Sequence, residues 1–122
     1  MDDIFSMRRV DPSKINLELD YKEYKKNLVY SSEKYSPFGP GIQYEFRFPN
    51  GYGASVIKLY GSYGYRENLW ELAVIKFGDS NDDYDYEINS DTGLTNDEGI
   101  IGYLNDYEVV EYLGKIEALA FA

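Results

Sequence analysis

The sequence contains no cysteine and no histidine. Their absence excludes disulfides, thiolate and imidazole metal sites, thiol nucleophiles and every mechanism that needs a histidine base. Long apolar runs are missing as well. No window approaches the roughly 18 apolar residues of a membrane-spanning helix, and residues 1–10 lack the apolar stretch of a secretory signal. We therefore expect a soluble, cytoplasmic protein that needs no metal or other cofactor.

Positive charge is scarce in the C-terminal third of the chain. Residues 1–76 carry 10 acidic and 11 basic side chains, whereas residues 77–122 carry 12 acidic side chains and one basic side chain. The net charge of −10 therefore arises after Lys76. Because carboxylates repel phosphates, this distribution argues against DNA, RNA or an anionic membrane as a direct partner and favours a partner with a basic surface.

An acidic segment of this kind is often a disordered tail. Here, however, apolar residues such as Ile88, Leu94 and Ile100 recur through it. They supply enough apolar surface to anchor the segment on a core, so we predict that it folds. The 122 residues correspond to one ordinary domain. We divide it into an N-terminal arm, residues 1–41, and an α+β core, residues 42–122.

Alternation of apolar and polar residues predicts four strands in this core. They are expected over residues 43–48, 54–60, 69–77 and 83–88. Asn50 and Gly51 supply the turn between the first two strands, since both residues tolerate a positive φ. Short connections between successive strands imply an antiparallel four-stranded meander.

The last predicted strand has an unusual pattern, in which Tyr84 and Tyr86 alternate with Asp83, Asp85 and Glu87. Alternate residues of a strand lie about 6.6 Å apart on one face, so this strand would present a row of carboxylates and an opposite aromatic face. Basic grooves that hold nucleic acid bind its phosphates with Lys and Arg, and such a row would fit the same groove.

A C-terminal helix is expected to cover the sheet. Asn105 is a good N-cap, Glu108 is placed to close a capping box, and Leu104 and Val109 are placed to form a hydrophobic staple. The apolar stripe of the helix comprises Val109, Leu113, Ile116 and Ala120. Helix and sheet together predict a two-layer α+β fold.

A shorter helix is expected in the N-terminal arm. Asp20 would cap it, and Tyr21, Tyr24 and Leu28 would share one face. The Pro- and Gly-rich segment over residues 36–41 is expected to be a loop that separates the arm from the core.

Three strings in the core resemble known sequences. Residues 52–57 read YGASVI, residues 68–75 read NLWELAVI, and residues 101–104 read IGYL, followed by Glu108 and Val109. Over residues 43–119 the chain resembles small uncharacterised proteins of phages and prophages in Gram-positive bacteria. It departs from their pattern in an acidic insert at residues 84–99 and an extension before Gly41. The resemblance implies a mobile-element setting and a protein that acts on host machinery, but it supplies no catalytic residues.

Motifs for catalysis or ion binding are incomplete. Gly51 and Gly53 lack the third glycine and the Gly-Lys-Ser or Gly-Lys-Thr of phosphate-binding loops. The acids that begin at Asp79 have the alternate spacing of a calcium loop, but Tyr84 stands where its glycine belongs and Ser90 where its last ligand belongs. Weak adventitious cation binding and a hydrolase built on paired carboxylates stay open as alternatives.

We predict a non-enzymatic protein whose acidic surface mimics nucleic acid. In a mobile-element setting it would be a phage-encoded inhibitor that binds the basic groove of a host defence protein, such as a CRISPR effector nuclease. Two alternatives stay open. The acidic residues would merely keep a tyrosine-rich protein soluble, or the protein would be a self-associating phage virion or assembly component. The partner-binding candidates are Asp79, Asp82, Asp83, Tyr84, Asp85, Tyr86, Glu87, Asp91, Asp97, Glu98, Tyr107, Glu108 and Glu111.

Overall fold

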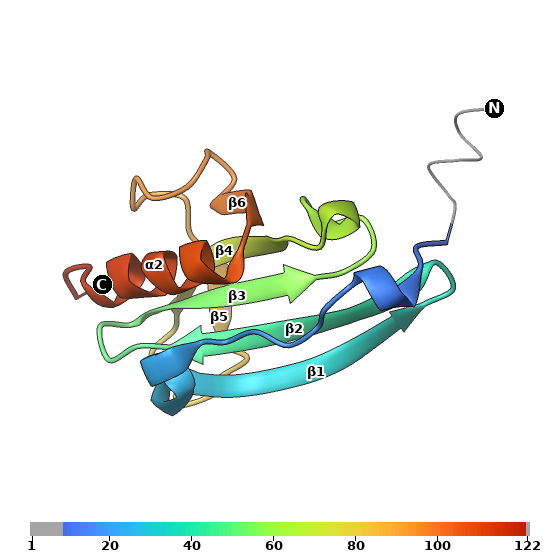
Figure 1. Cartoon of the computed structure of the whole chain (residues 1–122). Helices are drawn as coiled ribbons and strands as arrows, with labels where there is room; N and C mark the ends of the chain where they lie inside the picture. The colour runs from blue at the N-terminus through green and yellow to red at the C-terminus, as the bar shows by residue number, and fades with distance from the viewer. Residues whose placement is uncertain (1–8, 122) are drawn as a thin grey trace.

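The computed structural model describes residues 9–121, which form one antiparallel sheet of six strands, one α-helix and three 3-10 helices (Figure 1). The strands are β1 (Leu28–Ser36), β2 (Gly39–Arg47), β3 (Tyr52–Lys58), β4 (Trp70–Phe77), β5 (Tyr86–Ile88) and β6 (Ile100–Leu104). The helices are η1 (Pro12–Lys14), η2 (Lys22–Asn27), η3 (Tyr65–Glu67) and α2 (Asp106–Glu117). In this part of the chain, no helix has the length and apolar character needed to cross a membrane.

The sheet runs as a meander from β1 to β5, and β6 also pairs with β4. Because β3 occupies one edge of β4, β5 and β6 share the other edge, opposite residues 75–77 and 70–73 respectively. Between them, the Val74 N–H donates to the Gly99 carbonyl at 3.0 Å and the Val74 carbonyl accepts from the Asn89 N–H at 2.8 Å. We call the excursion between these two bonds, residues 89–99, the β5–β6 loop.

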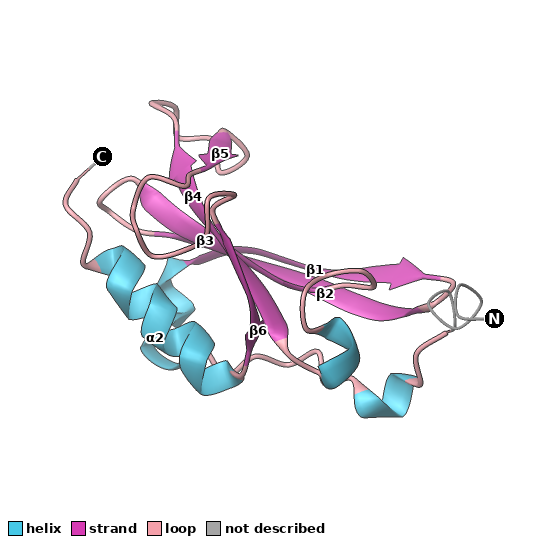
Figure 2. Ribbon diagram, turned by 90° about the horizontal axis from the view of Figure 1, so that it is seen from above, coloured by secondary structure: helices cyan, strands magenta, loops and turns pink. Residues whose placement is uncertain are grey.

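The main core lies between the sheet and α2. Phe46 and Trp70 of the sheet are fully buried and belong to the same apolar cluster as Leu113 of α2. The segment before β1 extends this cluster through Leu19 and Tyr24. Figure 2 shows α2 and the 3-10 helices on the same side of the twisted sheet. Each large apolar side chain buried here contributes roughly 1.5–3 kcal/mol to stability.

The α+β class and the local signals of the core are confirmed. The Asn105 Oδ1 accepts from the Glu108 N–H at 2.8 Å, and the Glu108 Oε1 accepts from the Asn105 N–H at 3.0 Å, which completes the capping box. In the turn between β2 and β3, Gly51 has a φ of 88°, a conformation that favours glycine. Ala120, however, lies beyond the C-cap residue Ala118 and is exposed, so it is not part of the helix stripe.

The sheet is larger than the predicted four strands, because β1 and β6 were not expected. β1 lies in the segment assigned to the N-terminal arm, and Leu28, predicted on a helix face, is its first residue. The loop predicted over residues 36–41 is a two-residue turn, and Gly39 already belongs to β2. The strand tolerates Pro40 because, in an antiparallel pair, only every second residue of a strand donates its N–H to the neighbouring strand. At the other positions a missing N–H costs no hydrogen bond to that neighbour.

The helix predicted after Asp20 is shorter and of a different type. η2 is a 3-10 helix with Tyr21 at its N-cap position and no side-chain cap. The Asp20 carboxylate instead pairs with Lys22 at 3.2 Å. Tyr24 fixes the position of the helix, because its ring is buried and packs edge-on against Phe48 with a centroid separation of 5.9 Å.

The strand predicted over residues 83–88 is wrong in its first half. β5 covers only Tyr86–Ile88, and the preceding residues form a turn in which the Asp85 N–H donates to the Asp82 carbonyl at 3.1 Å. The Gly78 N–H closes this turn by donating to the Asp85 carbonyl at 2.8 Å. Aspartate favours turns because its side chain bonds nearby backbone groups. The predicted row of three carboxylates along one strand is therefore not formed.

Candidate acidic binding surface

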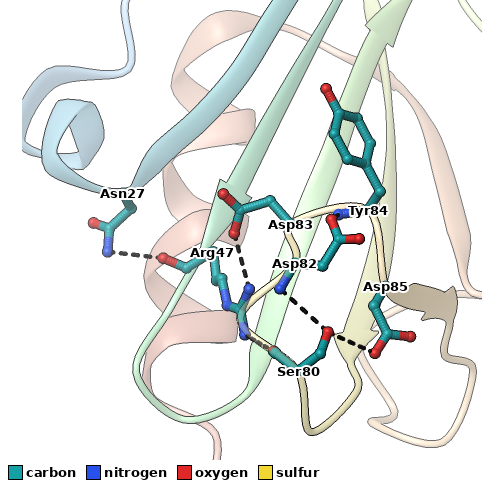
Figure 3. A network of polar contacts seen from close by, with 7 residues as sticks. All are labelled: Asn27, Arg47, Ser80, Asp82, Asp83, Tyr84 and Asp85. Atoms are coloured by element: carbon teal, nitrogen blue, oxygen red, sulfur yellow. Dashed lines mark hydrogen bonds and ion pairs between the residues drawn. The ribbon is translucent and has the colours of Figure 1, made fainter.

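Asp83 lies in the loop before β5, and not in a strand, and forms an ion pair with Arg47. Arg47 Nη1 lies 2.8 Å from Asp83 Oδ1, and Arg47 Nη2 donates to the Ser80 carbonyl at 3.2 Å (Figure 3). The Arg47 Cζ also lies 4.3 Å from the centroid of the Phe77 ring. Arg47 thus anchors the loop before β5, residues 78–85, to the end of β2. One predicted binding carboxylate is neutralised by this contact.

The same loop uses other polar groups internally. The Ser80 Oγ donates to Asp85 Oδ2 at 3.0 Å and accepts from the Asp82 N–H at 3.2 Å (Figure 3). Asp82 Oδ1 accepts from the Tyr84 N–H at 2.8 Å. The Tyr84 ring is 71% exposed and meets Tyr30 of β1 edge-on, with centroids 6.0 Å apart. Asp82 and Asp85 therefore shape the loop, whereas the side chain of Tyr84 is broadly exposed.

Next to this loop, Tyr86 makes a hydrogen bond to the buried carboxyl group of Glu45, a residue that the sequence analysis did not predict to be part of the site. The Tyr86 hydroxyl donates to Glu45 Oε1 at 2.8 Å, and Gln43 Nε2 donates to the same oxygen at 3.2 Å. Glu45 is only 2% exposed, and its Oε2 has no hydrogen-bond partner within residues 9–121. Burial raises the pKa of Glu45, and burial together with this carboxylate raises the pKa of Tyr86 to about 12.

Sequence reasoning missed Glu45 because the alternation of β2 places it on the sheet face away from the helix, where no covering segment was expected. Its neighbours Tyr44 and Phe46 point into the helix-side core, so Glu45 points to the opposite face. That face is covered here by residues 78–86, which are distant in sequence. No sequence pattern near Glu45 predicts that a distant segment buries it.

Two acids serve the start of α2. Glu108 completes the capping box, and Asp106 Oδ1 accepts from the Trp70 Nε1–H at 2.7 Å. Both carboxylates also lie at the positive end of the helix dipole. Of the predicted candidates on this helix, Glu108 is therefore a structural residue, whereas Glu111 and Tyr107 are exposed, Tyr107 to 69%.

Six predicted acids remain unengaged. All are exposed, and within residues 9–121 none of their carboxylates has a hydrogen-bond or ion-pair partner. We call them the free acids: Asp79, Glu87, Asp91, Asp97, Glu98 and Glu111. Three of the six lie in the β5–β6 loop.

Amide side chains give the β5–β6 loop its shape. Asn89 Oδ1 accepts from the Asp91 N–H at 3.0 Å, and Asn96 Oδ1 accepts from the N–H groups of Glu98 and Ile100 at 2.9 and 3.0 Å. The half-buried Leu94 packs against the main core. The loop is thus ordered without using its own carboxylates.

A surface cavity of about 330 Å³ brings three of the predicted acids together. Asp79, Asp85 and Glu87 line it, together with the exposed Lys76. In the described part of the chain, no three acidic side chains are arranged to hold a metal ion. The predicted single acidic face is thus divided among this cavity, the β5–β6 loop and α2.

A buried cation, Lys58, was also missed by sequence reasoning. It is 2% exposed, and its Nζ donates to the Asn16 carbonyl at 2.7 Å and to Asn68 Oδ1 at 2.9 Å. The Nζ also lies 4.1 Å from the centroid of the Trp70 ring. Burial lowers the pKa of Lys58 to about 8, although the charge of Asp106 opposes this. Lys58 ties the segment before β1 to the end of β3 and is not available to a surface ligand.

The three strings singled out in the sequence, residues 52–57, 68–75 and 101–104, lie in or directly beside the sheet. β3 and β6 contain the first and the last string, β4 contains the second from Trp70 onward, and Val56, Leu72 and Leu104 within them are buried. These buried residues of the strings therefore contribute to the packing of the sheet. No protein-family model matches the chain, and no curated protein or solved structure matches it.

Proposed function

We propose that this protein is a non-enzymatic, phage-encoded inhibitor that binds the basic nucleic-acid groove of a host defence protein, such as a CRISPR effector nuclease, in the host cytoplasm. One observation carries the proposal. The six free acids are exposed in the C-terminal third, and no described basic side chain pairs with them. Carboxylates left without a partner inside the chain are available to a partner outside it.

The size of the charge supports binding over solubility alone. A net charge of magnitude about 2–8 is sufficient to keep a small domain soluble, and this chain carries −10. Charge beyond that range opposes the compact state through self-repulsion. The excess is confined to residues 77–122, and half of the free acids lie in a single loop, which favours a role in recognition.

The β5–β6 loop is the part of this surface best placed to meet a partner. Figure 1 shows it extending away from the sheet between β5 and β6. It carries Asp91, Asp97 and Glu98, whose oxygens would accept charge-assisted hydrogen bonds from Arg and Lys of a basic groove. The exposed rings of Tyr84 and Tyr107 would add rigid contact area around these charges.

A charge-neutral triple variant tests the proposal. Asp91→Asn/Asp97→Asn/Glu98→Gln removes three charges and keeps side-chain size. Its matched control, Glu18→Gln/Glu23→Gln/Glu67→Gln, removes three exposed charges elsewhere on the chain. DNA cleavage by guide-loaded CRISPR effector nucleases is measured with each protein at low and high salt.

The wild-type protein and the control should inhibit cleavage of a susceptible nuclease, and high salt should weaken the inhibition. The loop variant should inhibit at least about tenfold less, since three charge contacts at about 0.5–1 kcal/mol each exceed 1.4 kcal/mol. Equal inhibition by the loop variant and the control would contradict the proposal.

A further inference from the structure

The edge of the sheet formed by β1 is open. β1 pairs with β2 on one side, and no strand within residues 9–121 pairs with its other side. The opposite edge of the sheet is filled, because β4 carries both β5 and β6. β1 is nine residues long, contains no proline and is neutral, since Glu33 and Lys34 balance. An open edge strand of this length is a template for another strand.

The position of Pro40 shows which backbone groups of β1 are unpaired. Opposed residues of antiparallel strands alternate between hydrogen-bonded and non-hydrogen-bonded pairs. Tyr35 lies opposite Pro40, which has no N–H, so this pair is of the non-hydrogen-bonded type. Tyr35, and by alternation Glu33 and Ser31, therefore direct their N–H and carbonyl groups away from β2. In agreement, the Glu33 carbonyl accepts from the Ser32 Oγ at 3.2 Å.

We propose that two copies of this chain pair through β1, antiparallel, about a twofold axis at Ser32. In this register Ser31 of each copy lies opposite Glu33 of the other and exchanges backbone hydrogen bonds with it. Tyr30 lies opposite Lys34. The pairing joins the two sheets into one and leaves β5 and β6, with the loop between them, at its outer ends.

The length and the charges of β1 together favour this register. A twofold axis perpendicular to the sheet pairs only residues on the same face, so the axis passes through one residue of β1. An axis at Glu33 places two carboxylates directly opposite each other, and an axis at Lys34 does the same with two ammonium groups. Like charges in such pairs are destabilising. The axis at Ser32 avoids both conflicts, and because Ser32 is the middle residue of β1 it brings the full length of both strands opposite each other.

The same register gives the side chains complementary partners. Within one copy, Lys34 Nζ already lies 3.2 Å from the Tyr30 hydroxyl, and the second copy would repeat this contact across the interface. Lys34 also lines an open cavity of about 200 Å³ together with Ser36 and Tyr60. Tyr30 of the second copy would lie at its rim. The 79% exposed ring of Tyr35 would approach the Val29 end of the second strand.

The contact is small, so the dimer is expected to be reversible. Regular pairing is interrupted by a bulge between Leu28 and Tyr30. Interfaces well below 1,000 Å² are typically weak and transient. We expect monomer and dimer to exchange at micromolar concentrations.

Cysteine substitutions test both the dimer and its register, because the chain has no cysteine of its own. At the axis, the two Ser32 residues form a non-hydrogen-bonded pair with Cα atoms about 4.5 Å apart, which a disulfide can span. Ser32→Cys should therefore cross-link under mild oxidation at least about tenfold faster than the matched variant Ser31→Cys. Sedimentation velocity of the wild-type protein should show concentration-dependent dimerisation.

A proline variant provides a second test. Glu33→Pro removes an N–H that β2 does not use, so the fold should persist while dimerisation is lost; Glu33→Gln, which keeps the N–H, is the control. Far-UV circular dichroism checks the fold. A wild-type protein that stays monomeric throughout would overturn the proposal and leave the edge to an extended segment of another protein. Faster cross-linking of Ser31→Cys than of Ser32→Cys would overturn the register.

Discussion

The start of α2 and the β5–β6 loop use the same residue types in opposite ways. At the start of α2, Asp106 accepts from the indole of the buried Trp70, and Glu108 completes the capping box. In the β5–β6 loop, asparagine side chains make the structural hydrogen bonds, and the carboxylates have no partner in the described part of the chain. The comparison separates acids that the fold needs from acids that are free to bind.

The largest effect is expected from Asp106→Ala. The variant leaves the Nε1–H of the fully buried Trp70 without an acceptor, which costs about 1–3 kcal/mol. It also removes a negative charge from the helix N-terminus, worth about 0.3–1 kcal/mol. We expect the free energy of unfolding to fall by about 2–3 kcal/mol in urea titrations followed by circular dichroism and by the fluorescence of this single tryptophan.

Asp106→Asn is the matched control, because it removes the charge but keeps an acceptor for the indole. Its loss should be less than half of that in Asp106→Ala. Equal losses in the two variants would show that charge at the helix end, and not the hydrogen bond to Trp70, dominates the role of Asp106.

The sequence could predict those features of the fold whose residues lie close together in the chain. The capping box joins Asn105 to Glu108, and the β2–β3 turn depends on Asn50 and Gly51, so both signals lie within a few residues. Such local signals do not depend on the rest of the fold. They were predicted correctly.

Contacts between distant residues were not predictable in this way. Alternation suggested a carboxylate row at Asp83, but its partner Arg47 is 36 residues away and draws the chain into a loop. β1 was missed because Ser31, Ser32 and Glu33 give it no apolar alternation, and its place in the sheet comes from pairing with β2. Tertiary pairing overrides local propensity in both cases.

Glu45 is neither one of the acids that cap α2 nor one of the free acids. The fold buries its carboxyl group but leaves one of the two oxygens without a hydrogen bond in the described part of the chain. Burial raises its pKa, and Asp83 adds to the shift, whereas the Tyr86 hydroxyl and Lys34 oppose it. A raised pKa means that the folded state holds the proton more tightly than the unfolded state. This contribution to stability is present below the ordinary pKa of 4.5 and is lost as the pH rises through the folded-state value.

Glu45→Gln should therefore gain stability relative to the wild-type protein as the pH is raised from 4 to 7. The measurement is the difference in unfolding free energy between the two proteins, which cancels the titration of the other acids. Glu87→Gln, which removes an exposed carboxylate, controls for the change in net charge. A difference that shrinks towards neutral pH would show that Glu45 is stabilised as a carboxylate, by Lys34 or by bound water.

The smallest effect on stability is expected where the proposed effect on binding is largest. The Asp91→Asn/Asp97→Asn/Glu98→Gln variant removes no described side-chain contact, because the loop is held by Asn89 and Asn96. Surface substitutions of this kind change stability by about 0.5 kcal/mol or less, and here the sign should favour folding because self-repulsion decreases. Urea titration at low salt measures the change. A loss above 1 kcal/mol would place these acids with Asp106, among the residues that hold the fold together, and would remove the physical basis for treating the β5–β6 loop as a binding surface.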